Sequence, residues 1–407
     1  MEQAKQEGGD QKRQALISVN DLNYVFPPDL AVSVNRTHTN HYFQNAEYTN
    51  QQRATCILNS GAHYGDMRNS SLEFGVRLNA ASTAGIKGYF GKNGSALNLI
   101  ESITISSRSG DEIARINQLN LLRYSSLALQ QTENWISTVG QSIGYGSNVN
   151  SRDSDRNTEY FSIPLPLLTE FFGYGRLMPS MLLSGLRISI SWADPGVAFV
   201  AADDGNGVNP VAGSIDGYII VNPYIALHAT QLTDGVQRAL NEMSAVNGLE
   251  IAYCDWETTQ QSFPTSQTLT TQLEVRKAAS RALQVFATER ITANVIADGT
   301  ADSFATADWD YERWQFQLGS LYFPQQPVQA SSDGTAVGDR TATAIPETYK
   351  HTLISFNSYK GGIQPSSALP LYHTTKFLGT RGDAALSLTT TNRTQAAISQ
   401  LAVPASN

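Results

Sequence analysis

The sequence of 407 residues has few charged side chains for its length. Asp, Glu, Lys and Arg together make up 16% of it, whereas about 25% is usual for a globular protein. So low a charge suggests that much of the surface lies against copies of the chain or against partners instead of water. The many Asn, Gln, Ser and Thr residues leave open the alternative that an uncharged polar surface is solvated.

Cysteine is also scarce, and the net charge is negative. The two cysteines, Cys56 and Cys254, belong to no CxxC pair, which argues against a disulfide framework and against a thiolate metal site. The net charge of -8 argues against specific binding of nucleic acid, because that binding depends on Lys and Arg that neutralise phosphates. We therefore expect a protein of a reducing compartment that has no cofactor and no specific nucleic-acid partner.

Long apolar runs are missing as well. The most apolar stretch, residues 177–202, is interrupted by Arg187, Asp194 and Pro195, so it is not expected to cross a bilayer. The first residues are charged and lack the apolar segment of a secretory signal. These features predict a soluble chain that has no transmembrane segment and is made inside the cell.

Short segments with a two-residue hydrophobic period dominate the sequence. In the clearest segment, the apolar residues Leu72, Phe74, Val76 and Leu78 alternate with Glu73, Gly75 and Arg77. Residues 186–192 show the same alternation. Weaker examples are residues 97–106, 217–228, 249–256, 282–291 and 351–359. Gly, Asn, Asp, Ser and Pro clusters separate them, which is typical of an all-β sandwich or barrel.

Two segments have helical spacing instead. They are residues 113–135 and residues 233–248, where Thr233 is a candidate N-cap and Asn247-Gly248 a candidate stop. We place a domain boundary at residues 240–248, since each half is then long enough for an eight-stranded sandwich. The expected divisions are a flexible arm over 1–15, a first sandwich over 16–243 and a second over 244–407.

The segment from Tyr311 to Pro327 is the most aromatic of the alternating stretches. Its first part places Trp314, Phe316 and Leu318 on one face, which predicts a strand buried on that side. Gly319-Ser320 is expected to form a bulge or bend. Pro324 and Pro327 are expected to end the strand pairing, because proline cannot donate to a β-ladder.

One segment matches a hydrolase motif. Residues 140–144, GQSIG, fit the GxSxG pattern, in which the serine occupies a strained turn between a strand and a helix. Here the following sequence, YGSNVNSRDSD, predicts a loop. The favoured interpretation of Ser142 is therefore a glycine-rich connection, and no catalytic residue is expected.

Three further motifs are too short to predict a site. His38 and His41 lie three residues apart, but no nearby carboxylate completes a metal triad. Residues 203–206 resemble part of a calcium loop that lacks its final glutamate. Residues 381–383 match an integrin-binding tripeptide, for which a plain turn is the simpler explanation. We therefore expect no metal site.

In order along the chain, these segments resemble the major capsid proteins of double jelly-roll dsDNA viruses, above all those of Polinton-like viruses, virophages and adintoviruses. The resemblance covers residues 16–372, and the stretches 163–192 and 314–327 carry most of it. It implies two upright jelly rolls, a homotrimeric capsomer with a pseudo-hexagonal outline, and an icosahedral shell in the virion. The structural or assembly candidates are Trp192, Trp314, Phe316, Leu318, Gly319, Pro324 and Pro327.

The resemblance also implies partners, namely neighbouring capsomers, penton proteins and minor or cement proteins. Exposed aromatics at the sandwich flanks and the loops 300–311 and 331–346 are candidate contacts, although either loop could face solvent. The main alternative is a β-sandwich carbohydrate-binding or adhesin module, which the Tyr, Trp and Asn content would suit. A hydrolase would depend on Ser142 alone.

Overall fold

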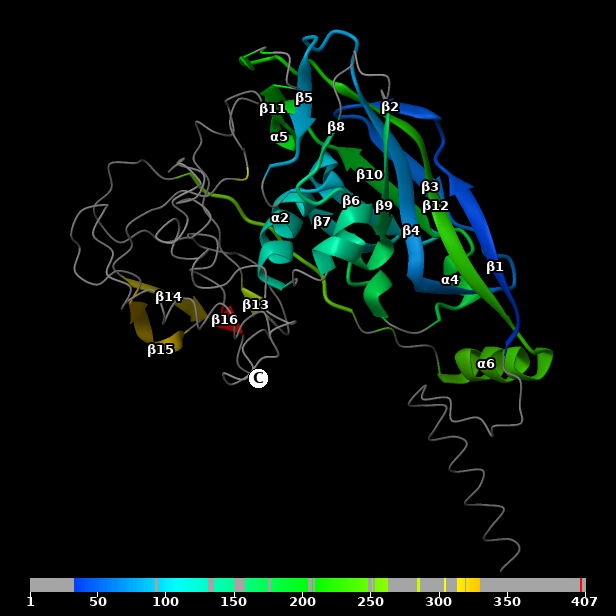
Figure 1. Cartoon of the computed structure of the whole chain (residues 1–407). Helices are drawn as coiled ribbons and strands as arrows, with labels where there is room; N and C mark the ends of the chain where they lie inside the picture. Colours follow the sequence, from blue (N-terminus) through cyan, green and yellow to red (C-terminus); the bar gives the residue numbers. More distant parts are fainter. Residues whose placement is uncertain are drawn as a thin grey trace, which may run out of the picture.

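The structure is a computed structural model of the whole chain. It describes residues 33–91, 94–130, 135–149, 158–174, 177–203, 207, 209–247, 251, 253–262, 284–285, 304, 313–318, 320–329 and 403–404. Most of the described residues belong to one β-sandwich between residues 33 and 232, and Figure 1 shows its strands packed together.

Two antiparallel sheets make up this sandwich. The first sheet has the order β1 (Ser33–Tyr42), β12 (Tyr218–Leu232), β4 (Tyr64–Leu78), β9 (Glu159–Pro164), and the short β2 (Glu47–Thr49) also pairs with β12. The second sheet has the order β3 (Arg53–Ile57), β10 (Arg187–Trp192), β6 (Ile100–Ser106), β7 (Glu112–Asn117). In Figure 1, β1, β12 and β4 run side by side, with β1 at the outer edge.

The strand order is that of a jelly roll. When the eight long strands of the two sheets are lettered B to I in chain order, the first sheet is B-I-D-G and the second is C-H-E-F. Each sheet thus combines strands from both ends of the segment, as two nested Greek keys require. This confirms the predicted all-β class and one eight-stranded jelly roll. The second predicted jelly roll, over 244–407, lies mostly outside the described residues.

The chain also forms a small third sheet and several helical elements. A three-stranded sheet has the order β11 (Val200–Asp203), β5 (Ile86–Tyr89), β8 (Asn148–Val149). The helical elements are η1 (Ala96–Leu99), α2 (Leu119–Gln130), η2 (Ile136–Gly140), η3 (Leu165–Leu167), η4 (Phe172–Tyr174), α4 (Ser180–Leu183), α5 (Pro195–Ala198) and α6 (Asp234–Asn247).

The two-residue periods seen in the sequence are the inner faces of the two sheets. On β4 the residues Leu72, Phe74, Val76 and Leu78 are all buried, and on β10 Ile188, Ile190 and Trp192 are fully buried. Because alternate side chains of a strand point to opposite faces, the polar residues between them face outward. Both predicted strands are confirmed.

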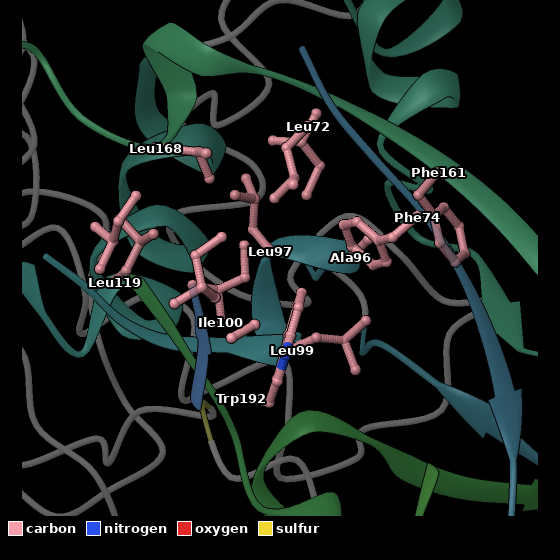
Figure 2. Close-up of a cluster of buried hydrophobic side chains, with 14 of the residues drawn as sticks. Leu72, Phe74, Ala96, Leu97, Leu99, Ile100, Leu119, Phe161, Leu168 and Trp192 are labelled. Atoms are coloured by element: carbon pink, nitrogen blue, oxygen red, sulfur yellow. The ribbon is translucent and has the colours of Figure 1, made fainter. Parts of the chain in front are cut away.

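Aromatic rings join the two sheets across the core. The Phe74 ring from the first sheet lies 5.4 Å from the Trp192 ring of the second sheet and 6.2 Å from the Phe161 ring of its own sheet. Figure 2 shows these side chains in one cluster with leucines of η1 and α2. Aromatic pairs at these separations add to the stabilisation that burial alone provides.

The helix predicted over 113–135 is only partly correct. Its first part is strand β7, and α2 begins at Leu119. Between them Gln118 adopts a left-handed conformation, with φ of 53°. The strand therefore ends at a position that no glycine or proline marks in the sequence. Pairing of Ile116 and Ala114 with β6 outweighs the helical spacing that the sequence shows here.

The helix predicted over 233–248 is confirmed as α6. The Gln237 amide donates to the Thr233 carbonyl over 2.9 Å, so the first turn begins at the expected residue. Leu240 of α6 is buried against Tyr64 and Leu232, at the end of the first sheet.

Residues 249–256, predicted as a weak strand, form none where the structure describes them. Instead residues 253–262, here named the strap, run past the edge strand β7. The Tyr253 hydroxyl donates to the Ile113 carbonyl, and the Thr258 hydroxyl donates to the Asn117 carbonyl over 3.0 Å. The strap thereby connects the segment after α6 to the second sheet. Of the other weak predictions, 282–291 contains β13 (Gln284–Val285), which pairs with β16 (Val403–Pro404), and 351–359 lies outside the described residues.

The aromatic segment that begins at Tyr311 forms a hairpin. Strand β14 (Arg313–Leu318) pairs with β15 (Leu321–Gln329), and Leu318 pairs directly with Leu321. Because β14 and β15 are two strands of a hairpin, the expected bulge within one strand is wrong, whereas the alternative, a bend, agrees with the reversal of direction. Gly319 itself is outside the described residues.

The two prolines do not end the strand pairing as predicted. Strand β15 continues beyond both, and Val328 pairs with Trp314. Pro324 and Pro327 lie within the irregular part of the ladder, where no backbone N–H is needed. There the Gln315 side-chain amide donates to the Pro324 carbonyl over 2.8 Å.

Candidate assembly surface

The outer face of the first sheet carries a line of tyrosines. The register places Tyr42, Tyr224, Glu73 and Ser162 in one row across β1, β12, β4 and β9. The Tyr42 and Tyr224 rings are 5.5 Å apart. Tyr42 is 65% exposed and Tyr160, two residues before Ser162 on the same face, is 72% exposed. We call Tyr42, Tyr160, Tyr224 and Glu73 the tyrosine face.

Hydrogen bonds hold the carboxylate of this face in place. The Ser71 hydroxyl donates to Glu73 Oε1 over 2.6 Å, and the Ser162 hydroxyl donates to the same oxygen over 2.7 Å. Burial is the main cause that raises the pKa of Tyr224, and the charge of Glu73 adds to it. The tyrosine therefore stays a neutral hydrogen-bond donor beside a fixed anion.

A glycine makes room for the most exposed ring. A Cβ built at Gly75 would lie 3.1 Å from the Tyr160 ring and 2.7 Å from the Thr158 methyl group. The ring can thus lie close to the β4 backbone. Tyrosines that are held in this way offer a large contact area at a low cost in conformational entropy, which is why they are common in protein interfaces.

Strand β1 borders the tyrosine face and forms the edge of the sheet. It is ten residues long, and within the part of the chain that the structure describes it pairs only with β12. Such a strand has unpaired N–H and C=O groups that another chain could bind. The tyrosine face and β1 together are the candidate assembly surface.

The sequence candidates lie elsewhere. Trp192 is fully buried in the core, and its indole Nε1 has no hydrogen-bond partner there. Trp314 is buried and Phe316 half-buried on the β14–β15 hairpin, where their rings meet edge to face at 5.6 Å. The side chain of Leu318 is not among the described residues.

The hairpin also has exposed residues that sequence reasoning did not single out. Leu321 is 61% exposed and Tyr322 49% exposed, beside the turn. In the predicted contact loop 300–311 the structure describes Phe304, which is buried with its ring stacked 5.1 Å from Tyr124 of α2. That residue contacts its own chain. The loop 331–346 and the tripeptide 381–383 lie outside the described residues.

The GxSxG serine is bound by backbone groups in the part of the chain that the structure describes. Ser142 lies two residues after the end of η2, in the last turn of a helical segment. Its hydroxyl donates to the Val139 carbonyl over 2.8 Å and to the Ser162 carbonyl over 3.2 Å. A nucleophile needs a base that accepts its proton, whereas here backbone carbonyls accept it. The serine therefore has a structural role at the junction of helix and sheet.

The histidine and aspartate motifs show no metal site where the structure describes them. His38 and His41 occupy β1, where odd spacing sends their side chains to opposite faces. The Asp203 carboxylate accepts a hydrogen bond from the Gly207 amide of its own loop at 3.1 Å, and residues 204–206 are not described. Within the described residues, no group of three or more His, Cys, Asp or Glu is placed to hold a metal ion.

The two cysteines differ in environment. Cys56 is buried, donates to the His41 carbonyl and has a pKa that burial raises to about 12, whereas Cys254 is exposed. Neither forms a disulfide. Among the helices that the structure describes, none combines the length and the hydropathy that a membrane span requires.

Comparison with known proteins gives structural neighbours only. No family model matches the sequence, and no curated protein matches it. Several solved structures have similar coordinates. One is PBCV-1 VP54 fitted into a reconstruction of the virophage Sputnik, with 12% identity, a TM-score of 0.33, and coverage of 53% of this chain and 46% of that one.

Two others are the Faustovirus major capsid protein and the mavirus major capsid protein. The first has 8% identity and a TM-score of 0.36 over 54% of this chain and 58% of that one. The second has 13% identity and a TM-score of 0.27, and the match covers 51% of this chain and 50% of that one. The matched part spans about half the length of these proteins. The strand order of the two sheets by itself defines the jelly roll.

Proposed function

We propose that this chain is the major capsid protein of a double-stranded DNA virus, with three copies forming a capsomer that tiles an icosahedral shell. The observation that carries the proposal is the B-I-D-G and C-H-E-F strand order of residues 33–232. The sequence resemblance described above also supports this family of capsid proteins, and it extends over both halves of the chain. The proposed location is the virion shell, after synthesis inside the host cell.

The surface chemistry of the sandwich supports a role in assembly. The tyrosine face offers exposed rings on a rigid sheet, and β1 adds an edge that pairs on one side only within the described residues. A stable interface buries about 1,200–2,000 Å² in total. Two such contacts per chain would cover much of a sandwich flank, which agrees with the low charge of the sequence.

Closed rings form when one surface of a subunit binds a different surface of the next. In this proposal the tyrosine face is one such surface and the segment after the strap contributes to the other. The second jelly roll, over 244–407, belongs to the proposal, as do the contacts with penton and minor capsid proteins. The β14–β15 hairpin, with its exposed Leu321 and Tyr322, is a candidate for those contacts.

Light scattering coupled to size-exclusion chromatography tests the proposal. The full chain should elute as a species of three times 44.2 kDa, or as larger assemblies of that unit. Tyr160→Arg should shift it toward the monomer, because a charge would enter the contact without a partner. Tyr160→Phe is the matched control and should keep the trimer. A stable monomer for the unmodified chain would contradict the proposal.

A carbohydrate-binding module is the second candidate. The observation in its favour is the Glu73 carboxylate fixed beside the half-buried Tyr224 ring and the exposed Tyr42 ring, since rings and carboxylates bind sugars. A monomer that binds a neutral glycan, and loses it in Glu73→Gln, would favour this function over the capsid.

A further inference from the structure

The outer face of the second sheet differs from the tyrosine face in chemistry. It contains a shallow depression of about 430 Å³ with a floor of hydroxyl side chains from three neighbouring strands. The register places Thr55, Ser189 and Thr104 in one row across β3, β10 and β6. The Thr55 and Ser189 hydroxyls are 3.2 Å apart and share a hydrogen bond.

Arginines surround this hydroxyl row on three sides. Arg53 lies two residues before Thr55 on β3, Arg187 lies two residues before Ser189 on β10, and Arg115 of β7 is the Cα partner of Thr104. Because β3 and β10 are antiparallel, Arg53 and Arg187 lie at opposite ends of the depression. At about 3.3 Å per residue each backbone is about 7 Å from the row, which is within the reach of an arginine side chain.

These guanidinium groups have few acidic neighbours. Among the described residues neither Arg53 nor Arg187 forms an ion pair, and Arg115 uses its Nε to donate to Asn117. One carboxylate, that of Glu112, lies in the lining. Two arginines, Arg53 and Arg187, line the depression against one glutamate, and Arg115 lies beside it on β7. The depression is therefore positive on a chain whose net charge is -8.

Positive, fork-shaped donors beside hydroxyl groups are suited to tetrahedral oxyanions. A guanidinium binds two oxygens of one sulfate or phosphate at once, and hydroxyls donate to the remaining oxygens. Since Arg53 and Arg187 belong to rows about 13 Å apart, the depression suits a ligand with more than one anionic group.

The lining also distinguishes between two classes of polyanion. Proteins that bind single-stranded nucleic acid stack its bases on aromatic rings, and the residues that line this depression include no aromatic side chain. Polar Ser and Thr side chains form its floor instead, and these suit the hydroxyl groups of a sugar. The volume is in the usual range for small-ligand sites, about 300–1,000 Å³.

We propose that the outer face of the second sheet binds a sulfated carbohydrate, with Arg53, Arg187 and Arg115 holding the sulfate groups over the Thr55–Ser189–Thr104 floor. This proposal does not depend on the capsid function. The site is a surface depression of one described sandwich, on the opposite sheet from the tyrosine face.

Surface plasmon resonance with immobilised heparin oligosaccharide tests it on the full-length protein. The unmodified chain should bind, and its affinity should fall as salt rises because bound ions are released. Arg53→Ala and Arg187→Ala should each weaken binding at least fivefold, and the double variant should remove it. Arg187→Lys should bind at an intermediate level, because lysine keeps the charge but not the fork.

Arg36→Ala is the matched control, since Arg36 is an exposed arginine on β1 of the other sheet. It should bind like the unmodified chain. An equal loss of heparin affinity in Arg36→Ala and Arg187→Ala would overturn the proposal, because binding would then follow net charge alone. Desulfated heparin should not bind, and equal binding of it would also overturn the proposal.

Two further outcomes would point to other ligands. If a DNA oligonucleotide bound better than the oligosaccharide and lost affinity in the same variants, the site would be for nucleic acid and the proposal would be wrong. If the arginine variants changed the oligomeric state and not heparin binding, the depression would be a contact between chains. If the unmodified chain bound heparin but formed no trimer, that result would contradict the capsid proposal and leave the carbohydrate proposal standing.

Discussion

Replacing Phe74 by alanine should weaken the sandwich more than any change on the outside of the same strand. The Phe74 side chain is 2% exposed and lies between the Trp192 and Phe161 rings, at centroid distances of 5.4 Å and 6.2 Å. It therefore contributes both burial and aromatic contacts that join one sheet to the other.

The size of the effect follows from the area lost. An aromatic side chain buries about 150–250 Å², and the part beyond Cβ, on the order of 120 Å², gives about 3 kcal/mol at about 25 cal/mol per Å². The cavity left between the sheets adds to this, so we expect about 3–5 kcal/mol. That is about 30–50% of a stability of about 10 kcal/mol.

Arg77→Ala on the same strand is the control. Arg77 is paired with Glu47 at 2.8 Å, but the two side chains are 38% and 52% exposed. Solvent screens such a pair, so its loss should cost about 0–1 kcal/mol.

Hydrogen exchange in increasing denaturant, followed by mass spectrometry, measures the local free energy of unfolding. Peptides that cover β4 and β10 should lose protection together in Phe74→Ala, because the residue contacts both sheets. A loss below about 1 kcal/mol, or a loss as large in Arg77→Ala, would refute the packing described for this core.

Three further predictions concern single residues. In the native chain Cys254 should react with a thiol reagent while Cys56 does not, because burial raises the Cys56 pKa to about 12; counting labelled thiols by mass checks this, and a native count of two contradicts it. Gly144→Ala should lower the melting temperature by several degrees, because φ is 67° there and a Cβ would lie 2.4 Å from the Phe161 ring; an unchanged melting curve would show that the ring moves freely. Tyr253→Phe should speed exchange of the β7 edge amides by removing the bond from the strap, and unchanged exchange would mean that the strap does not protect this edge.

The strands that the sequence predicted well are those with a buried face. In β4 and β10 the apolar period coincides with burial because each strand packs on the core from one side only. Strand β1 gave no such signal. Its sequence SVNRTHTNHY is mostly polar, and its position comes from pairing with β12, which is a long-range contact.

Other misses have equally local reasons. The end of β7 depends on a left-handed Gln118, which no glycine or proline marks in the sequence. In the hairpin, a glycine followed by a serine suggested a bulge within one strand, whereas β14 and β15 pair with each other. Pro324 and Pro327 are tolerated because they lie in the irregular part of that pairing.

The sequence predicted that exposed aromatic residues would form a contact surface, but it did not predict which residues lie in the candidate surfaces. Exposed aromatics at a flank were expected, yet which tyrosines share a face depends on the register of four strands, as for Tyr42, Tyr224 and Glu73. The arginine depression likewise combines the consecutive strands β6 and β7 with β3 and β10, which are distant from them in the sequence. Without the jelly-roll order, nothing brings Arg53 and Arg187 to one site.

Electron cryomicroscopy of the purified full-length protein tests the central claim most directly. The account predicts a threefold particle in which each chain contributes two upright sandwiches, six in all, with Tyr160 at a contact between them. A particle with one sandwich per chain, or a lone monomer at micromolar concentration, would contradict it.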